Sequence, residues 1–223
     1  MSDNATAHKA ADYEAEVERT IPFHAEILRT AIDVALAVVP APKTWLDTGC
    51  GPGKLVELAK ARAPRCEFSL ADPSEAMLAL ARARHAGAQF FGAATEDLDA
   101  GPFDVITAIQ CHHYGDVDAR FRALVRCREM LAPAGVFVTF ENVRAESDEG
   151  HAVQRKRWAD FQRRAGRDEA TVEMQLAREG KSFFPIRVSE HLALFARAGF
   201  SRVEIVWRAY GQAGFYAQSP DSQ

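Results

Sequence analysis

The chain has 223 residues, of which 48% are hydrophobic and 26% are charged, and its formal net charge is -4. This composition is typical of a folded globular chain and excludes a largely disordered or collagen-like one, while the length suits a single domain. The negative charge argues against broad nucleic-acid binding, which needs many Lys and Arg residues to displace counterions.

The cysteines and the apolar runs indicate the cellular environment. The chain holds four cysteines without a C-x-x-C pair, at Cys50, Cys66, Cys111 and Cys127. This spacing predicts neither a disulfide framework nor a metal site, and it suits a reducing compartment. No apolar run approaches the ~20 residues of a membrane helix, and residues 1–12 lack the apolar stretch of a signal peptide. We therefore predict a cytoplasmic protein with no metal and no membrane contact.

The predicted elements begin with helices and continue as an alternation of strands and helices. Apolar residues at helical spacing predict an N-terminal helical segment over 11–39, and Pro40 and Pro42 end it. Short apolar runs then predict strands at 44–47, 67–71, 89–93, 103–109 and 136–141. Amphipathic stretches between them predict helices at 54–63, 74–85 and 117–131. Such alternation is typical of βαβ units and a mainly parallel sheet.

The alternation stops between 143 and 185, where a charged, helix-prone stretch predicts an inserted cap. A helix at 189–198 and two β-rich runs at 202–209 and 214–218 follow, and the short connection at Gly211 joins only antiparallel neighbours. We predict one α/β domain over 1–223. Its Rossmann-like, mainly parallel sheet would end in a C-terminal antiparallel hairpin and carry N-terminal helices and a helical cap insertion.

A glycine-rich loop separates the first predicted strand from the helix after it, and it reads Asp47-Thr48-Gly49-Cys50-Gly51-Pro52-Gly53. Backbone N–H groups are free at such a helix start, and glycines let a ligand approach them. The third glycine comes one residue too early for a dinucleotide-binding loop. Leu55 stands where an ATP-binding P-loop needs Ser or Thr. An acidic residue followed by G-x-G-x-G instead resembles motif I of the class I S-adenosylmethionine (SAM)-dependent methyltransferases.

This resemblance covers most of the chain and implies SAM as the cofactor. In it, Asp47 either secures the loop or contacts the amino end of SAM, and the loop contributes Gly49, Cys50, Gly51 and Gly53. Asp72 follows the second strand at the spacing of a ribose-binding acid, with helix capping as its alternative role. The family pattern further implies contacts with the nucleoside from Pro73, Met77, Ala94 and Asp97, where Asp97 would accept from the adenine amino group.

Residues 110–114 follow the buried strand at 103–109, and the carboxyl ends of parallel strands face the ligand crevice. The segment resembles motif IV of the same family, which implies that Gln110 borders the cofactor. His112 and His113 are candidate general bases, because an imidazole titrates near neutral pH, and structural packing is their alternative role. Cys111 has no activating partner in the sequence and is interpreted as a small buried residue.

A second resemblance involves shorter patterns, among them Ile21-Pro22-Phe23-His24 and Ala198-Gly199-Phe200. They are similar to the carboxy-SAM synthases of tRNA wobble-uridine modification. In that group an arginine grips a carboxylated cofactor, and the resemblance implies Arg178 for this role, although the alignment slips there by a residue or two. The basic stretch at 154–167 is either a solvated helical face or a site for an anionic acceptor or RNA, so a tRNA pathway stays open.

These observations lead to three functional hypotheses. The first is methyl transfer from SAM to a small-molecule acceptor, enclosed by the N-terminal helices and the cap and contacted by Tyr13, Phe23, Tyr114 and Arg178. The second is a carboxy-SAM synthase-like enzyme. The third is a SAM-binding module without catalysis. No motif in the sequence specifies the acceptor or the oligomeric state.

Overall fold

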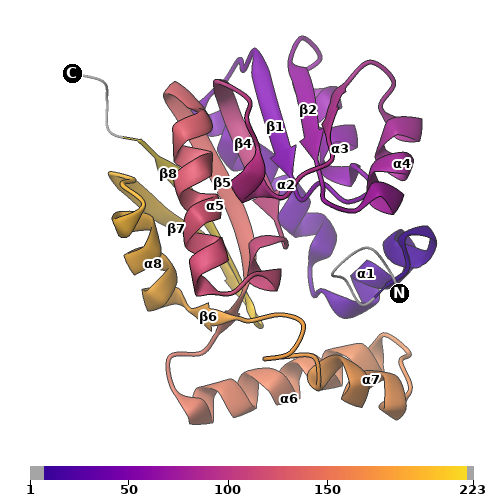
Figure 1. Ribbon diagram of the computed structural model, residues 1–223. Coiled ribbons are helices and arrows are strands. Elements are labelled where there is room, and N and C mark those ends of the chain that lie inside the picture. The colour runs from indigo at the N-terminus through magenta and orange to yellow at the C-terminus, as the bar shows by residue number, and fades with distance from the viewer. Residues whose placement is uncertain (1–7, 220–223) are drawn as a thin grey trace.

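An eight-stranded sheet forms the centre of the computed structural model, which describes residues 8–219 (Figure 1). The strands are β1 (Thr44–Thr48), β2 (Glu67–Ala71), β3 (Gln89–Phe91), β4 (Phe103–Ile109), β5 (Leu131–Arg144), β6 (Ile186–Arg187), β7 (Arg202–Ala209) and β8 (Gln212–Gln218). Their order is β3-β2-β1-β4-β5-β8-β7, and β6 pairs with the end of β5. Strands β1 to β5 run parallel, while β8 is antiparallel to both β5 and β7. The predicted parallel sheet with its C-terminal hairpin is confirmed.

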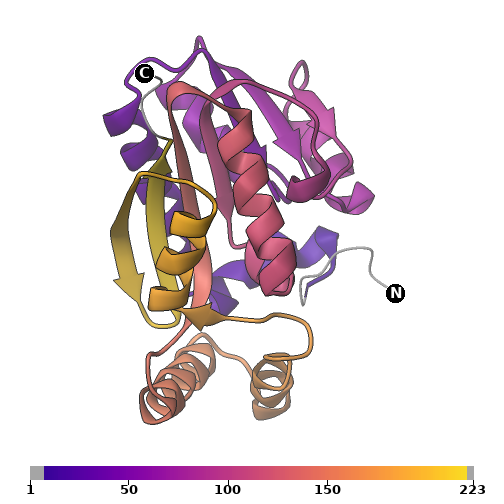
Figure 2. The same cartoon turned by 60° about the vertical axis from the view of Figure 1, so that its left-hand side comes forward.

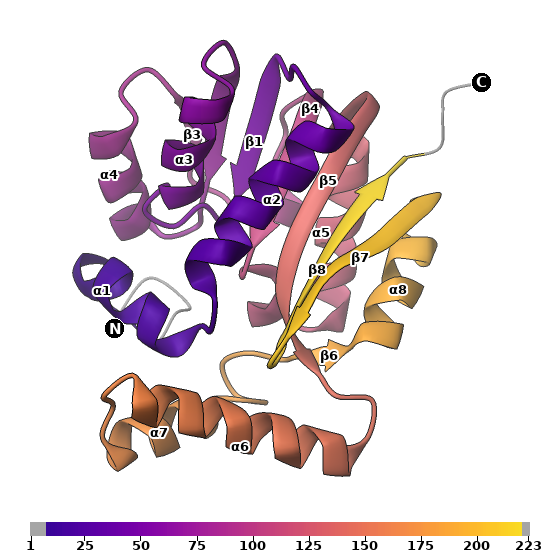
Figure 3. The same cartoon turned by 180° about the vertical axis from the view of Figure 1, so that it is seen from behind.

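Helices cover both faces of the sheet. Three of them, α2 (His24–Val38), α3 (Lys54–Arg62) and α4 (Glu75–Arg84), bury their apolar residues in one core cluster. Two others, α5 (Val117–Met130) and α8 (Val188–Arg197), share a second cluster on the opposite face. Figure 1 shows α5 and α8 in front of the sheet, and Figure 3 shows α2 crossing its other face. The central strands are therefore buried on both sides, as parallel sheets require.

The edge where the parallel strands end is covered by further helices. They are η1 (Ala10–Asp12), α1 (Tyr13–Thr20), α6 (Asp148–Arg164) and α7 (Glu169–Leu176). Figure 2 shows α6 and α7 as a pair below the sheet. Polar contacts join this pair to α1: the Trp158 Nε1–H donates to the Thr20 carbonyl at 2.7 Å, and the Arg167 guanidinium donates to Glu16 and Thr20. Two 3-10 turns, η2 (Thr95–Asp97) and η3 (His112–Tyr114), lie at the same edge.

The largest departure from the expected boundaries is β5, which runs from Leu131 to Arg144 and not only over 136–141. Its polar end pairs with β8, where Asn142 lies opposite Gln212, so β8 also begins two residues earlier than expected. Hydrophobic periodicity misses such ends because tertiary pairing, not apolar burial, makes them extended. No helix among residues 8–219 is both long and apolar enough to cross a membrane.

Gly214 of β8 lies opposite Phe140 of β5, and a substitution at Gly214 tests how closely these two strands pack. A Cβ at this position would lie 2.5 Å from Cε1 of Phe140, whose side chain is fully buried. Gly214→Ala should therefore lower the free energy of unfolding by about 1–3 kcal/mol, the usual cost of overpacking, as measured by urea denaturation. Gly92→Ala is the matched control, because its Cβ would make only an ordinary contact at 3.9 Å with Leu78. Equal stability of the two variants would contradict this packing.

Candidate functional site

A cavity of about 280 Å³ opens where β1, β2 and β4 end. Most of the cofactor residues expected from the sequence meet there, together with Tyr13 of α1 and His112 of η3. The full lining is Tyr13, Gly49, Gly51, Asp72, Pro73, Ser74, Met77, Ala94, Thr95, Glu96, Ile109, Gln110, Cys111, His112, Tyr114, Gly115, Ala119, Arg120 and Ala123. We refer to it as the cofactor cavity.

The glycine loop forms one wall of the cofactor cavity, and its backbone explains why it needs glycine. Gly49, Gly51 and Gly53 have φ angles of +63°, +53° and +81°, which residues with a side chain rarely adopt. A Cβ on Gly49 would overlap the side chain of Cys111, whereas a Cβ on Gly51 would meet no atom within 4 Å. Gly51 thus leaves open space for a ligand against the backbone.

Asp72 fastens this loop to the end of β2. Its Oδ2 accepts the Gly51 N–H at 2.9 Å, and its Oδ1 accepts the Ser74 N–H, also at 2.9 Å. Ser74 in turn caps α4 by accepting the Met77 N–H at 3.2 Å. Asp72 therefore orders the start of α4, and because its carboxylate also lines the cofactor cavity, its ribose-binding role stays a prediction.

Three residues of the expected cofactor set lie in or next to the loop but outside the cavity lining. Asp47 is 3% exposed and accepts the Thr107 hydroxyl at 2.7 Å, so its position favours the loop-securing alternative. The backbone N–H of Cys50 donates to the Ala71 carbonyl at 3.0 Å, which ties the loop to β2. Gly53 packs against the ring of His85, which bonds the Gly53 carbonyl.

The acidic residue that faces the cavity after β3 is Glu96, not Asp97. Glu96 lines the cofactor cavity, whereas Asp97 is exposed and is absent from that lining. Successive side chains of a 3-10 turn point about 120° apart, so two adjacent acids cannot both face one cavity. The sequence offered both carboxylates, and only the geometry of the turn distinguishes them.

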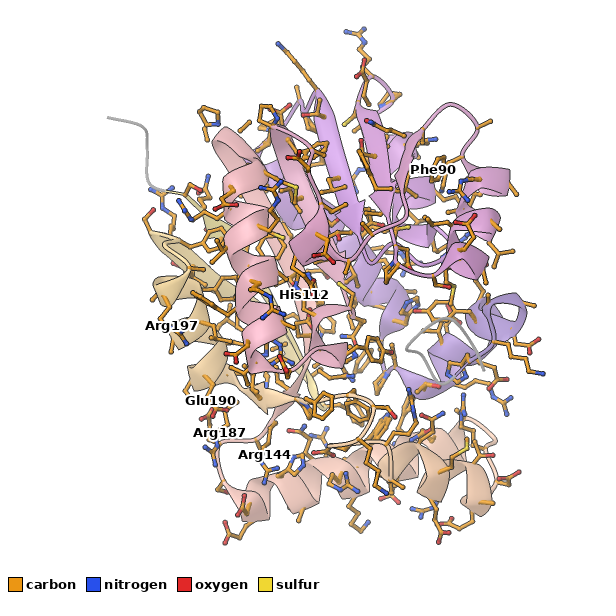
Figure 4. The ribbon with its side chains drawn as sticks, viewed as in Figure 1. Phe90, His112, Arg144, Arg187, Glu190 and Arg197 are labelled. Atoms are coloured by element: carbon orange, nitrogen blue, oxygen red, sulfur yellow. The ribbon has the colours of Figure 1, made fainter. Side chains whose placement is uncertain are left out.

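His112 and His113 differ sharply in their surroundings. His112 lines the cofactor cavity, near the centre of the molecule in Figure 4, and its Nε2 lies 3.0 Å from Oγ1 of Thr95. Burial lowers the pKa of His112, which keeps its ring neutral. His113 lies outside the cofactor cavity and is 1% exposed. Its Nδ1 lies 2.9 Å from Glu141 Oε2, and its Nε2 lies 3.1 Å from Asn142 Nδ2. Both ring nitrogens of His113 are thus engaged away from the cofactor cavity.

Glu141 holds the histidine turn in place from the neighbouring strand. Its two carboxylate oxygens accept the backbone N–H groups of His112 and His113 at 3.2 and 2.9 Å. Burial alone would raise the pKa of Glu141, but the hydrogen bond from His113 and the nearby positive groups lower it to about 2. The carboxylate is therefore negatively charged at neutral pH, and no sequence motif singled it out.

Glu141 also belongs to the one group of three potential metal ligands found in residues 8–219. Its carboxylate, the Cys111 thiol and the His112 ring have ligand atoms within 4.8 Å of one another. Burial raises the pKa of the Cys111 thiol well above its ordinary value, so this group stays a protonated, poor ligand. Because the Glu141 oxygens already accept several N–H groups, hydrogen bonding accounts for the cluster.

A second, smaller cavity of about 40 Å³ adjoins the cofactor cavity under α1, α6 and α7. The two cavities share Tyr13, Gln110 and Tyr114, and Arg178 lines only the smaller one. The lining is His8, Tyr13, Val17, Thr20, Ile21, Gln110, His113, Tyr114, Asn142, Trp158, Gln175, Arg178, Phe183 and Gln212. We name this the second cavity. Sequence reasoning missed Asn142, Trp158 and Gln212, which no motif marks.

Phe23 does not line either cavity, contrary to the expectation that it contacts the acceptor. Its side chain is 48% exposed and packs on the outer surface against Trp207 and Tyr210, with ring centroids 6.0 Å away in both cases. Phe23 has a φ of +61° at the start of α2, and this turn of the backbone accompanies the outward position.

Comparison with known proteins identifies the family. Residues 46–137 match a family model described as a methyltransferase domain. The chain is 26% identical to a carboxy-S-adenosyl-L-methionine synthase from Wolinella succinogenes, over 96% of this chain and 92% of that protein. These matches support a class I SAM-dependent methyltransferase. This methyltransferase is also 35% identical to a demethylmenaquinone methyltransferase from Thermus thermophilus, over 56% of this chain and 59% of that protein.

A solved structure has the same fold. The human N-acetylserotonin methyltransferase in complex with SAM superposes with a TM-score of 0.62 at 15% identity, covering 94% of this chain. The methyltransferase described here spans 58% of that longer protein. The predictions of a SAM-dependent enzyme and of SAM as its cofactor are confirmed.

The buried Asp47 makes the stability of this methyltransferase depend on pH. Burial raises the pKa of Asp47 to about 7 despite the hydrogen bond from Thr107, whereas an unfolded Asp titrates near ~3.9. Between these values the folded state keeps a proton that the unfolded state loses, so stability falls as pH rises through this window. Asp47→Asn removes this effect. Between pH 4 and pH 8, the free energy of unfolding of the variant should rise by roughly 1–4 kcal/mol relative to that of wild type, as measured by urea denaturation. A difference in unfolding free energy that does not change with pH would argue against the buried proton.

Proposed function

We propose that this chain transfers a methyl group from SAM to a small-molecule acceptor. The observation that carries the proposal is the junction of two cavities through Tyr13, Gln110 and Tyr114. The larger cavity lies against the glycine loop and suits a nucleoside cofactor. The smaller one lies beyond it, beneath helices, where a compact acceptor can meet the methyl group. A site so enclosed favours a small acceptor over a macromolecule.

Within the cofactor cavity, each wall suits one part of SAM. Asp72 would hold the ribose, because its carboxylate lines the cofactor cavity and carboxylate oxygens accept hydrogen bonds from sugar hydroxyls. Met77 and Ala94 would border the adenine, with Glu96 accepting from its amino group. The backbone at Gly49 and Gly51 would meet the amino-acid end.

The reaction needs little from the protein beyond alignment of the acceptor with the methyl group. SAM supplies an activated methyl group on its sulfonium, whose sulfur leaves with the bond pair when the acceptor lone pair attacks. The protein contributes by holding the acceptor in line, which Gln110 and Tyr114 are placed to do. If the acceptor atom carries a proton, His112 is the candidate base, since its neutral ring lines the cofactor cavity.

A carboxy-SAM synthase-like reaction is the second candidate. The similarity to the synthase from Wolinella succinogenes extends over nearly the whole of both chains. Arg178 lies in the second cavity, where a carboxylate on the cofactor would reach it. We further propose a cytoplasmic location, supported by four cysteines that are all unpaired.

Substitutions in the loop test the cofactor site. Gly51→Val should abolish binding of S-adenosylhomocysteine (SAH) in calorimetry, because its side chain would fill the open space beside the loop. Asp72→Ala should weaken SAH binding by one or two charged hydrogen bonds, about 1.5–3 kcal/mol each. Glu96→Ala should weaken it as well, and Asp97→Ala is the matched control because Asp97 is exposed and does not line the cofactor cavity. Unchanged affinity in the first three variants would refute the site.

Arg178 separates the two reactions. Methyl transfer predicts that wild type and Arg178→Ala both co-purify with SAM or SAH, as identified by mass spectrometry. A synthase predicts a carboxylated SAM on the wild type that disappears in Arg178→Ala. Arg157→Ala is the control, because Arg157 is an exposed arginine of the same cap that stacks on Tyr210. Detection of the carboxylated cofactor on wild type would overturn methyl transfer as the main activity.

A further inference from the structure

Gln110 has a buried side-chain amide without a hydrogen-bond partner. The residue is 6% exposed, and neither its Oε1 nor its Nε2 bonds to any of the described residues. More than about 90% of buried polar groups are satisfied in folded proteins, and an unsatisfied one costs about 1–3 kcal/mol. Because Gln110 lines both cavities, a molecule bound between them can supply the missing partners.

The backbone at Gln110 is strained as well. Its φ is +57°, a left-handed conformation that residues with long side chains rarely adopt. Its N–H remains bonded to the Phe140 carbonyl at 2.7 Å, so the sheet holds the residue in this conformation. Strain of this kind persists where the surrounding structure enforces it, and it clusters at binding and catalytic sites.

A second unpartnered amide oxygen lies in the same small cavity. A hydrogen-bond chain starts at Glu141, which accepts from His113 Nδ1, and this fixes His113 Nε2 as the acceptor for the Asn142 amide. Asn142 Oδ1 then accepts from Gln212 Nε2 at 3.3 Å, which leaves Gln212 Oε1 without a partner among the described residues. The Glu141 carboxylate at the start of this series of hydrogen bonds therefore orients Gln212 Oε1 as a hydrogen-bond acceptor.

We propose that Gln110 determines which methyl acceptor the site binds. Its carboxamide would pair with a neutral group that carries a hydrogen-bond donor and a hydrogen-bond acceptor side by side, as in an amide or lactam. The proposal rests on the proposed methyl transfer, because it assigns the acceptor class of the same site. Gln110 would donate from Nε2 to the carbonyl of the acceptor molecule and accept its N–H at Oε1. Gln212 Oε1 would take a further N–H.

The arrangement of donors and acceptors favours this class over charged ones. A carboxylate has only acceptors and would leave the oxygens of Gln110 and Gln212 unpaired, whereas an ammonium has only donors and would leave Gln110 Nε2 unpaired. The hydroxyl of Tyr114 stays neutral, because burial raises its pKa to about 12. Arg178 already lies 3.4 Å from Gln175 Oε1 and over the ring of Phe183.

The size of the second cavity agrees with a small head group. Its volume of about 40 Å³ corresponds to about three water molecules at ~10–15 Å³ each. An amide group of a few heavy atoms fits this space, with the remainder of the acceptor extending toward the cofactor cavity. Gln110 stands at the boundary between the two cavities, where the reacting atom must meet the methyl group.

The test uses the full ¹⁵N-labelled chain saturated with SAH and three probes of similar size, namely acetamide, acetate and methylammonium. Acetamide should shift the side-chain NH₂ resonance of Gln110 and bind at least tenfold more tightly than either ion. Gln110→Leu should weaken acetamide binding at least tenfold more than it weakens SAH binding. Gln110→Asn, whose shorter side chain tolerates a positive φ, should show the same split and guards against misfolding of the Leu variant.

Gln162→Leu is the matched control, because Gln162 is also fully buried with both amide atoms unpartnered but lines neither cavity. Acetamide affinity should not change in this variant. Three results would overturn the proposal. They are tighter binding of acetate than of acetamide, equal losses of affinity for acetamide and SAH in the Gln110 variants, and unchanged acetamide affinity in those variants. Failure of wild type to bind SAH would instead overturn the proposed function, so the two failures are distinguishable.

Discussion

The structure depends most on the carboxylate of Asp72, which joins the glycine loop to the second strand. One oxygen holds the Gly51 N–H and the other holds the Ser74 N–H, so one side chain sets both the loop and the start of α4. The positive φ angles of the loop are tolerable because glycine adopts them without steric cost. Contacts within the chain therefore hold the wall of the cofactor cavity, and such preorganisation limits the entropy lost on binding.

A second buried carboxylate organises the other half of the site. Glu141 fixes the turn at His112 and His113 through backbone N–H groups, and it orients Asn142 and Gln212 through the His113 ring. Its low pKa means that this anchor keeps its charge at neutral pH. A histidine committed to such a chain serves orientation, so the histidine left facing the cofactor cavity is His112.

The sequence predicted those parts of the fold and site that local patterns control. Strand and helix alternation, the antiparallel hairpin and the glycine loop all follow from periodicity and spacing, and they are present in the structure. The outward turn of Phe23 and the choice of Glu96 over Asp97 depend on the direction of single backbone turns, which composition does not determine. Glu141 was missed because in the sequence it is only the polar end of an apolar strand. Its role depends on the turn that packs against it.

The two carboxylates divide the site into regions of different chemistry. Asp72 is a carboxylate in the lining of the cofactor cavity, which suits a sugar with two hydroxyl donors. Glu141 is enclosed, and its influence reaches the second cavity through the His113 ring and the amides of Asn142 and Gln212, which alternate donor and acceptor. Asp72 thus presents charge to the cofactor, whereas Glu141 acts on the acceptor only through the dipoles of other side chains. An amide-lined cavity gains specificity because a group of the wrong polarity leaves its buried amides unpaired. Gln110 stands where these two regions meet, and for this reason its unpaired carboxamide is informative about the acceptor.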